Sequence, residues 1–116
     1  MTKATLGAGD VSVLLDGEMV TLRPTLRAAQ TISRQAGGIV TCMQTVGKFD
    51  FDTIVMVVAQ GIRKVKPNEI TEVAEQVYRT GLTDLVPKLI EYLTNLANGG
   101  RPATAGDENP PKKDSA

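Results

Sequence analysis

Few residues in this chain have the types and spacing that enzyme chemistry requires. Asp50 and Asp52 are the one close acidic pair beside an apolar segment, and paired carboxylates can act as general acid and base. Either side chain can instead cap the helix expected to follow them, which involves no chemistry. Cys42 is the single cysteine and the chain has no histidine to activate it, so we expect a buried structural thiol.

Motifs for cofactor, phosphate and metal sites are also missing. Neither Gly7-Ala8-Gly9 nor Gly37-Gly38 is followed by the residues that complete a phosphate-binding loop. An acyl carrier needs a serine directly after the aspartate that opens a helix, whereas Asp84 is followed by Leu85. The lack of histidine and of a second cysteine removes the usual metal ligand sets. We therefore expect no catalytic residue, metal or cofactor, and a protein that is not an enzyme.

Charge and hydropathy narrow the classes of partner. The 116 residues include 13 Lys and Arg and 13 Asp and Glu, so no net charge attracts nucleic acid or anionic lipid. The longest apolar run, Ile54 to Ala59, is far shorter than the roughly 20 residues that span a bilayer. No signal-like apolar stretch follows the N-terminus, and a lone thiol suits a reducing compartment. We expect a cytoplasmic protein that binds neither nucleic acid nor membrane.

Composition divides the chain into one folded domain and two flexible ends. Residues 99–116 contain no apolar side chain larger than alanine, so this segment cannot bury enough surface to fold and is expected to be a disordered tail. Residues 1–9 are expected to be flexible as well. The remaining residues, 10–98, are predicted to form a single α+β domain that is mainly helical: an N-terminal β-hairpin packed on a bundle of about five helices.

The predicted hairpin covers residues 11–23. Asp16-Gly17 suits a type I′ turn between two segments of alternating hydrophobicity. With these two residues as the loop, the side chains expected to face a core are Val11, Val13, Val20 and Leu22. Leu14 and Met19 pair on the opposite face. Because an isolated hairpin is marginal in water, we expect it to pack on helices, and its edge could also pair with a second copy of the chain.

Helical periodicity follows the hairpin. The expected helices are 24–36, 39–46, 51–64, 69–80 and 84–98, the fourth capped by Asn68. The inward positions that the spacing indicates include Leu26, Val40, Val46, Ile70, Val73, Val77, Tyr78, Leu85, Leu89 and Leu93. Residues 53–58 are rich in β-branched side chains that favour strands, but an N-cap at Asp50 or Asp52 and apolar residues at helical intervals favour a helix. Arg63 and Lys64 are expected in its last turn.

Four apolar residues are candidates for binding a partner. Met56 and Val57 fall off the main apolar face of the third helix, so this helix is either buried on two sides or presents apolar surface. With Leu14 and Met19 they form the candidate partner-binding set. The alternative is that these residues belong to an ordinary core or are scattered on the surface.

The order of these segments is itself informative. A hairpin, VSVLLDGEMVTLRPTLRAA, runs through Leu-Arg-Pro-Thr-Leu into the first helix, GGI follows, and a later helix closes in Ala-Gln-Gly-Ile-Arg. This arrangement, over about residues 10–98, resembles the tail assembly chaperones of gene transfer agents and of long-tailed (siphovirus-type) phages. The resemblance implies a small protein of the bacterial cytoplasm that binds the tape measure protein, helps recruit tail tube subunits and leaves before the particle is finished.

Two other functions stay open. Related proteins are also described as tail tube or tail structural proteins, which would be retained in the particle. Tube proteins are generally rich in β-structure, however, and this chain offers one hairpin. The second alternative is a small regulatory or adaptor module that uses the same helical surface to bind an unrelated protein.

Overall fold

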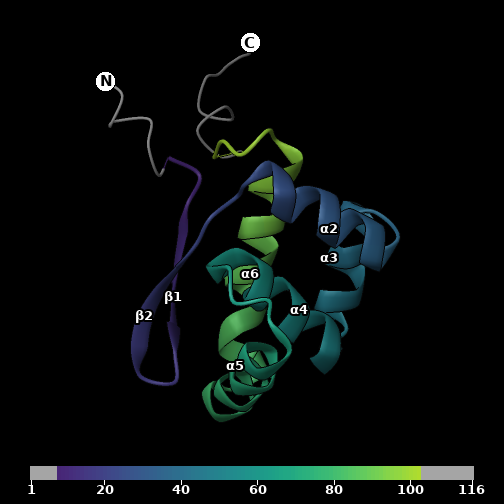
Figure 1. The fold of residues 1–116 in the computed structure, drawn as a ribbon. Coiled ribbons are helices and arrows are strands. Elements are labelled where there is room, and N and C mark those ends of the chain that lie inside the picture. Colours follow the sequence, from purple (N-terminus) through teal and green to yellow (C-terminus); the bar gives the residue numbers. More distant parts are fainter. Residues whose placement is uncertain (1–7, 103–116) are drawn as a thin grey trace.

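The computed structural model describes residues 8–102. Its elements are the strands β1 (Val11–Leu15) and β2 (Glu18–Leu22) and the helices α2 (Leu26–Ala36), α3 (Ile39–Gly47), α4 (Phe51–Ile62), α5 (Pro67–Thr80) and α6 (Leu82–Ala97). In Figure 1 the hairpin lies on one side of α6, and α2 and α3 lie on the other. The predicted fold class, a hairpin packed on five helices, is confirmed.

The hairpin has the predicted register. Val11 pairs with Leu22, Val13 with Val20 and Leu14 with Met19. Asp16 and Gly17 both have positive φ, 51° and 86°, as a type I′ turn requires. The inner face is buried as expected at Val11, Val13 and Leu22, with Leu15 added to it and Val20 half-buried. The dipeptide that forms the turn therefore also decides which face of the hairpin covers the core.

The β-branched segment is a helix, α4, and most of its surface is buried. Asp50 caps it, because the Asp50 carboxylate accepts hydrogen bonds from the Thr53 backbone N–H (3.1 Å) and hydroxyl (2.5 Å). Tertiary packing outweighs intrinsic strand propensity here, since α4 contacts β2 and all four other helices. The helix ends at Ile62, and Arg63 adopts a left-handed conformation beyond it, so the prediction that Arg63 and Lys64 lie in the last turn is wrong.

Three helices each expose one residue that the spacing placed inward. Leu26, Val40 and Tyr78 are 74%, 65% and 78% exposed, respectively. Val46 in α3 and Val73 and Val77 in α5 are buried as predicted, whereas the buried residues Ala28 and Ile32 in α2 and Cys42 in α3 were not among the predicted inward positions. Each of these helices carries apolar residues over a wide arc, and the neighbouring elements decide which part of that arc is covered.

Helix starts also differ from the predicted ones. Helix α2 begins at Leu26 after the N-cap Thr25, whose hydroxyl accepts from the Ala28 N–H at 3.1 Å. Helix α5 begins at Pro67, ahead of the predicted cap Asn68, because Glu69 reaches back and accepts a hydrogen bond from the Lys66 N–H at 3.2 Å. Proline at the first position loses no helical hydrogen bond. Helix α6 starts at Leu82, directly after Gly81.

The two ends of the described chain meet. The Asn95 side-chain amide donates to the Gly9 carbonyl at 3.0 Å, and the Gly100 N–H donates to the Asn95 carbonyl at 2.8 Å. A side chain at Gly9 would collide with the Gly100 carbonyl. Gly9 and Gly100 are thus part of the folded domain, which is slightly longer than residues 10–98. Residues 1–7 and 103–116, most of the predicted flexible ends, lie outside the described residues.

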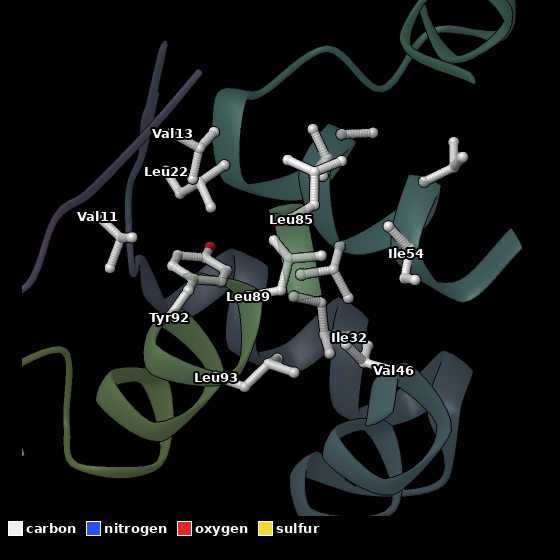
Figure 2. Packing of buried hydrophobic residues seen from close by; sticks show 14 of the residues in the cluster. Val11, Val13, Leu22, Ile32, Val46, Ile54, Leu85, Leu89, Tyr92 and Leu93 are labelled. Carbon is white, nitrogen blue, oxygen red and sulfur yellow. The ribbon is translucent and has the colours of Figure 1, made fainter. Parts of the chain in front are cut away.

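Helix α6 supplies the centre of the core. Leu85, Leu89 and Leu93 are buried as predicted, and Figure 2 shows Tyr92 among them, facing the hairpin residues Val11 and Leu22. The Tyr92 hydroxyl donates to the Arg23 carbonyl at 2.7 Å. Burial, with a smaller effect from the Asp10 charge, raises the pKa of Tyr92 above its ordinary value and keeps the hydroxyl protonated as a donor.

Replacing Tyr92 with phenylalanine should lower the free energy of unfolding by about 1 kcal/mol, because the ring is retained and one buried hydrogen bond is lost. Tyr78→Phe is the matched control: its side chain is largely exposed, so the change should stay within about 0.5 kcal/mol. Urea denaturation followed by circular dichroism measures both. Equal effects of the two substitutions would show that the Tyr92 hydrogen bond adds nothing to stability.

A glycine allows α4 to approach the hairpin closely. A Cβ at Gly61 would lie 2.7 Å from Leu22 Cδ2, closer than packed side chains come, and 3.3 Å from Leu22 Cα, which is tighter than most such contacts. The Arg23 N–H, at the end of β2, donates to the Gly61 carbonyl at 2.9 Å. The absence of a side chain at Gly61 therefore permits both the packing of Leu22 and this backbone hydrogen bond.

Gly61→Ala should destabilise the protein by about 1–3 kcal/mol through overpacking, although alanine favours helices. Gly47→Ala provides the comparison, because Gly47 also lies in a helix and a Cβ there meets nothing within 4 Å. This second substitution should be neutral or stabilising by up to about 1 kcal/mol. Thermal unfolding of the two variants gives the test, and a stabilising Gly61→Ala would contradict the close approach.

Candidate partner-binding surfaces

The structure separates the four candidate partner-binding residues. Leu14 and Met19 are 56% and 67% exposed and lie together on the outer face of the hairpin. Val57 is completely buried, so its assignment to a binding surface is wrong. It belongs to the core cluster, because α4 contacts β2 and all four other helices and is therefore covered on more than one side. Met56 is half-buried and lines a groove between α4 and α5.

The first surface is a groove beside the hairpin, here called the hairpin groove. It has a volume of about 540 Å³. Its lining residues are Ser12, Val13, Leu14, Met19, Thr80, Asp84, Leu85 and Lys88. Leu14 and Met19 are the exposed apolar residues of this lining, and α6 provides one acidic and one basic side chain, Asp84 and Lys88.

Both strands of the hairpin have open outer edges. In a two-residue hairpin the pair next to the turn, Leu15 and Glu18, exchanges backbone hydrogen bonds, and every second pair does the same. The backbone groups of Ser12 and Leu14 therefore point outward from β1. Within residues 8–102 the sheet has two strands, and no third strand pairs with either edge. The open edge of β1 borders the hairpin groove, which suits an extended peptide.

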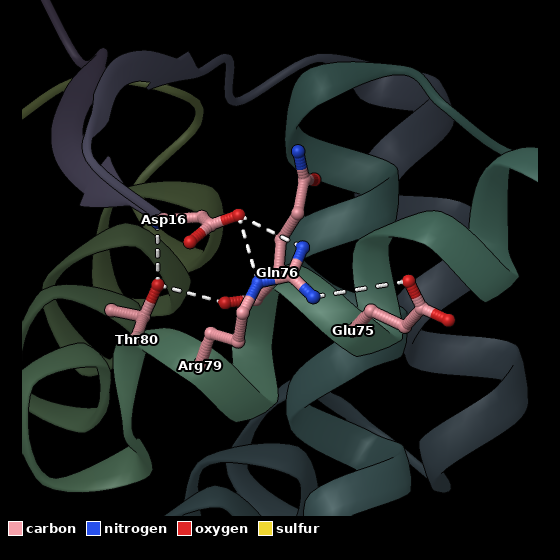
Figure 3. Close-up of polar contacts among 5 residues, drawn as sticks. All are labelled: Asp16, Glu75, Gln76, Arg79 and Thr80. Atoms are coloured by element: carbon pink, nitrogen blue, oxygen red, sulfur yellow. Dashed lines mark hydrogen bonds and ion pairs between the residues drawn. The ribbon is translucent and has the colours of Figure 1, made fainter.

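Polar contacts hold the hairpin turn against α5 (Figure 3). The Asp16 N–H donates to the Thr80 hydroxyl at 2.6 Å, and that hydroxyl donates to the Gln76 carbonyl at 2.8 Å. Arg79 binds the Asp16 carboxylate through Nε (3.0 Å) and Nη2 (2.9 Å), and this hydrogen bond and charge raise the pKa of Arg79. Such exposed ion pairs add little stability, but they fix the orientation of Leu14 and Met19 relative to the helices.

The second surface is a groove of about 500 Å³ between α4 and α5, here called the helix groove. Its apolar lining is Val55, Met56, Ala59, Val65, Ile70 and Ala74, and its polar lining is Gln35, Asp52, Gln60 and Thr71. The sequence indicated only Met56 as a candidate here. Val65 and Ile70 were missed as surface residues, although an apolar residue inside the basic segment Arg63–Lys66 was a signal that could have drawn attention to them.

Of Cys42, Asp50 and Asp52, the residues first considered for catalysis, two have structural roles in the fold. Burial raises the pKa of the Cys42 thiol to about 11, so it is an unreactive core residue. The hydroxyl and then the N–H of Thr53 lower the pKa of Asp50, which acts as the helix cap. Asp52 is exposed at the helix groove. Across residues 8–102, no three His, Cys, Asp or Glu side chains are grouped so as to hold a metal ion.

Among residues 8–102, no helix combines the length and the apolarity that a membrane span requires. Comparisons of the chain with models of protein families, with curated proteins and with solved structures find no match.

The burial of Val57 can be tested directly. Val57→Asp places a carboxylate in the core and should abolish cooperative folding, because the unpaired charge costs several kcal/mol there. Met19→Asp adds the same group on the outer face of the hairpin and should change stability by no more than about 0.5 kcal/mol. Circular dichroism and thermal melts distinguish the two. A folded Val57→Asp protein would contradict the burial of this side chain.

Proposed function

We propose that this protein is a tail assembly chaperone of a phage or gene transfer agent. In this role it binds the tape measure protein, helps to recruit tail tube subunits and does not remain in the finished particle. The tail-specific part of the proposal rests on the resemblance in the order of the hairpin and helices. The protein-binding part rests on the surfaces described above.

The single observation that carries the protein-binding role is the outer face of the hairpin. Leu14 and Met19 expose neighbouring apolar side chains beside the hairpin groove, and β1 has an open edge along the same groove. Apolar side chains next to unpaired backbone groups can bind an extended segment through both main-chain hydrogen bonds and side-chain contacts. A partner that must later be released calls for an interface of modest size.

The test is a pull-down of the full-length protein from cells that express the neighbouring tail genes. The wild-type protein should recover the tape measure protein, and the double variant Leu14→Asp/Met19→Asp should lose at least tenfold in recovery. Val40→Asp is the matched control, since Val40 is an equally exposed apolar residue on α3, outside both grooves. It should bind as the wild type does.

Three outcomes would change the proposal. If the wild-type protein recovers no tail protein, the assembly function is wrong and an adaptor role replaces it. If the double variant binds normally, the hairpin is not the binding surface. Mass spectrometry of purified particles addresses retention: stoichiometric presence of this protein would identify a structural component of the tail.

A further inference from the structure

The helix groove has properties that the hairpin groove lacks. Its main walls are α4 and α5, two helices in contact that are joined by the four-residue segment Arg63–Lys66, and Gln35 of α2 also lines it. Val65 and Ile70 are partly exposed along it, and Met56 is half-buried at its floor. Methionine adapts its shape to different apolar surfaces, which suits a floor that must accept another side chain.

The backbone of the groove walls restricts what can bind there. The N–H and C=O groups in the middle of α4 and α5 are bonded within their own helices, so they offer no partner to an extended peptide. A strand lying on this apolar floor would lose hydrogen bonds to water without replacing them. A helix satisfies its own backbone and can place an apolar face on the floor. The walls therefore favour a helical ligand.

Charge along the groove gives the helical ligand a direction. At the connecting end, Arg63, Lys64 and Lys66 place three exposed cations within four residues, and the ion pairs found in residues 8–102 include none of them. At the other end, near the start of α4, Asp52 lines the groove. Helices commonly carry acidic residues in the first turn and basic residues in the last, which complement their own dipole. Such a helix matches the groove when its first turn lies at the cationic end.

We propose that the helix groove binds an amphipathic partner helix that runs along the groove, with its acidic first turn at Arg63, Lys64 and Lys66 and its basic last turn near Asp52. This inference rests on the proposed protein-binding function and names the chemistry of a second contact with the partner. The hairpin would bind an extended segment, and the helix groove a helical one.

Two synthetic peptides of equal composition test the direction. Each is as long as α5, 14 residues, with leucine at positions i, i+3, i+4 and i+7. One carries glutamate in its first turn and lysine in its last, and the other has these charges exchanged. Titration of the full-length protein, followed by fluorescence anisotropy of the labelled peptide, should show at least tenfold tighter binding of the first peptide. Equal binding of the two peptides, or binding of neither, would overturn the proposal.

Exposed residues supply variants that leave the fold intact. Lys64→Glu/Lys66→Glu should reverse the preference between the two peptides, whereas Lys88→Glu, in the hairpin groove, should leave it unchanged. Ile70→Glu should weaken both peptides at least tenfold. Retained preference in the double lysine variant would contradict the assigned direction, and unaltered binding by Ile70→Glu would place the peptide elsewhere.

Other occupants give different results. If a second copy of the chain fills the groove, sedimentation will show a dimer that Ile70→Glu dissociates. If residues 103–116 fill it, their removal will strengthen peptide binding at least tenfold. Either result overturns the assignment to a partner helix. The peptide assay and the pull-down fail independently. Loss of peptide binding with intact recovery of the tape measure protein would remove this inference and leave the proposed function standing.

Discussion

The rest of the structure depends on the close contact between α4 and the end of β2. A two-stranded sheet has too little surface to be stable alone, and it becomes part of the domain where Leu22 lies against Gly61 and the Arg23 N–H reaches the Gly61 carbonyl. Tyr92 binds the other polar group of the same residue, the Arg23 carbonyl, from the opposite element. Strand, central helix and last helix thus meet at one residue, and their relative positions are fixed there.

This joint accounts for the two surfaces. Burying one face of the hairpin against α4 and α6 leaves Leu14 and Met19 on the other face and leaves both strand edges open. Packing of α4 against β2 and the other helices removes Val57 from solvent, and a groove lies at the boundary of α4 with α5. The two surfaces differ in what they offer a ligand, since one has free backbone groups and the other has apolar side chains flanked by charge.

The sequence predicted the hairpin and the helical state of α4 correctly, because residues that are neighbours in the chain indicate both. Asp16-Gly17 set the turn, and the turn set the hairpin register and its buried face. Asp50 and the apolar intervals after it indicated α4 despite its β-branched side chains. Tyr92 and Asn95 were missed as polar contacts because their partners, Arg23 and Gly9, are 69 and 86 residues away in the chain.

The exposed helix faces and the grooves depend on contacts between different elements rather than on residues within one of them. Leu26, Val40 and Tyr78 have the periodicity of core residues, yet they are exposed because no element within residues 8–102 covers them. Val65 belongs to a connection rather than to a helix, so no periodic pattern marks it. The helix groove forms where α4 and α5 pack against each other, and the spacing of residues within either helix carries no information about that contact.

The meeting of Gly9 with Gly100 has a consequence for how the chain could be rearranged. Because the Asn95 amide and backbone already hold the two ends of the described chain together, joining them through a short linker would close a loop at little entropic cost. A new opening could then be made in an exposed connection such as Lys48–Asp50. Both grooves would survive such a circular permutation, since neither Gly9 nor Gly100 lines them.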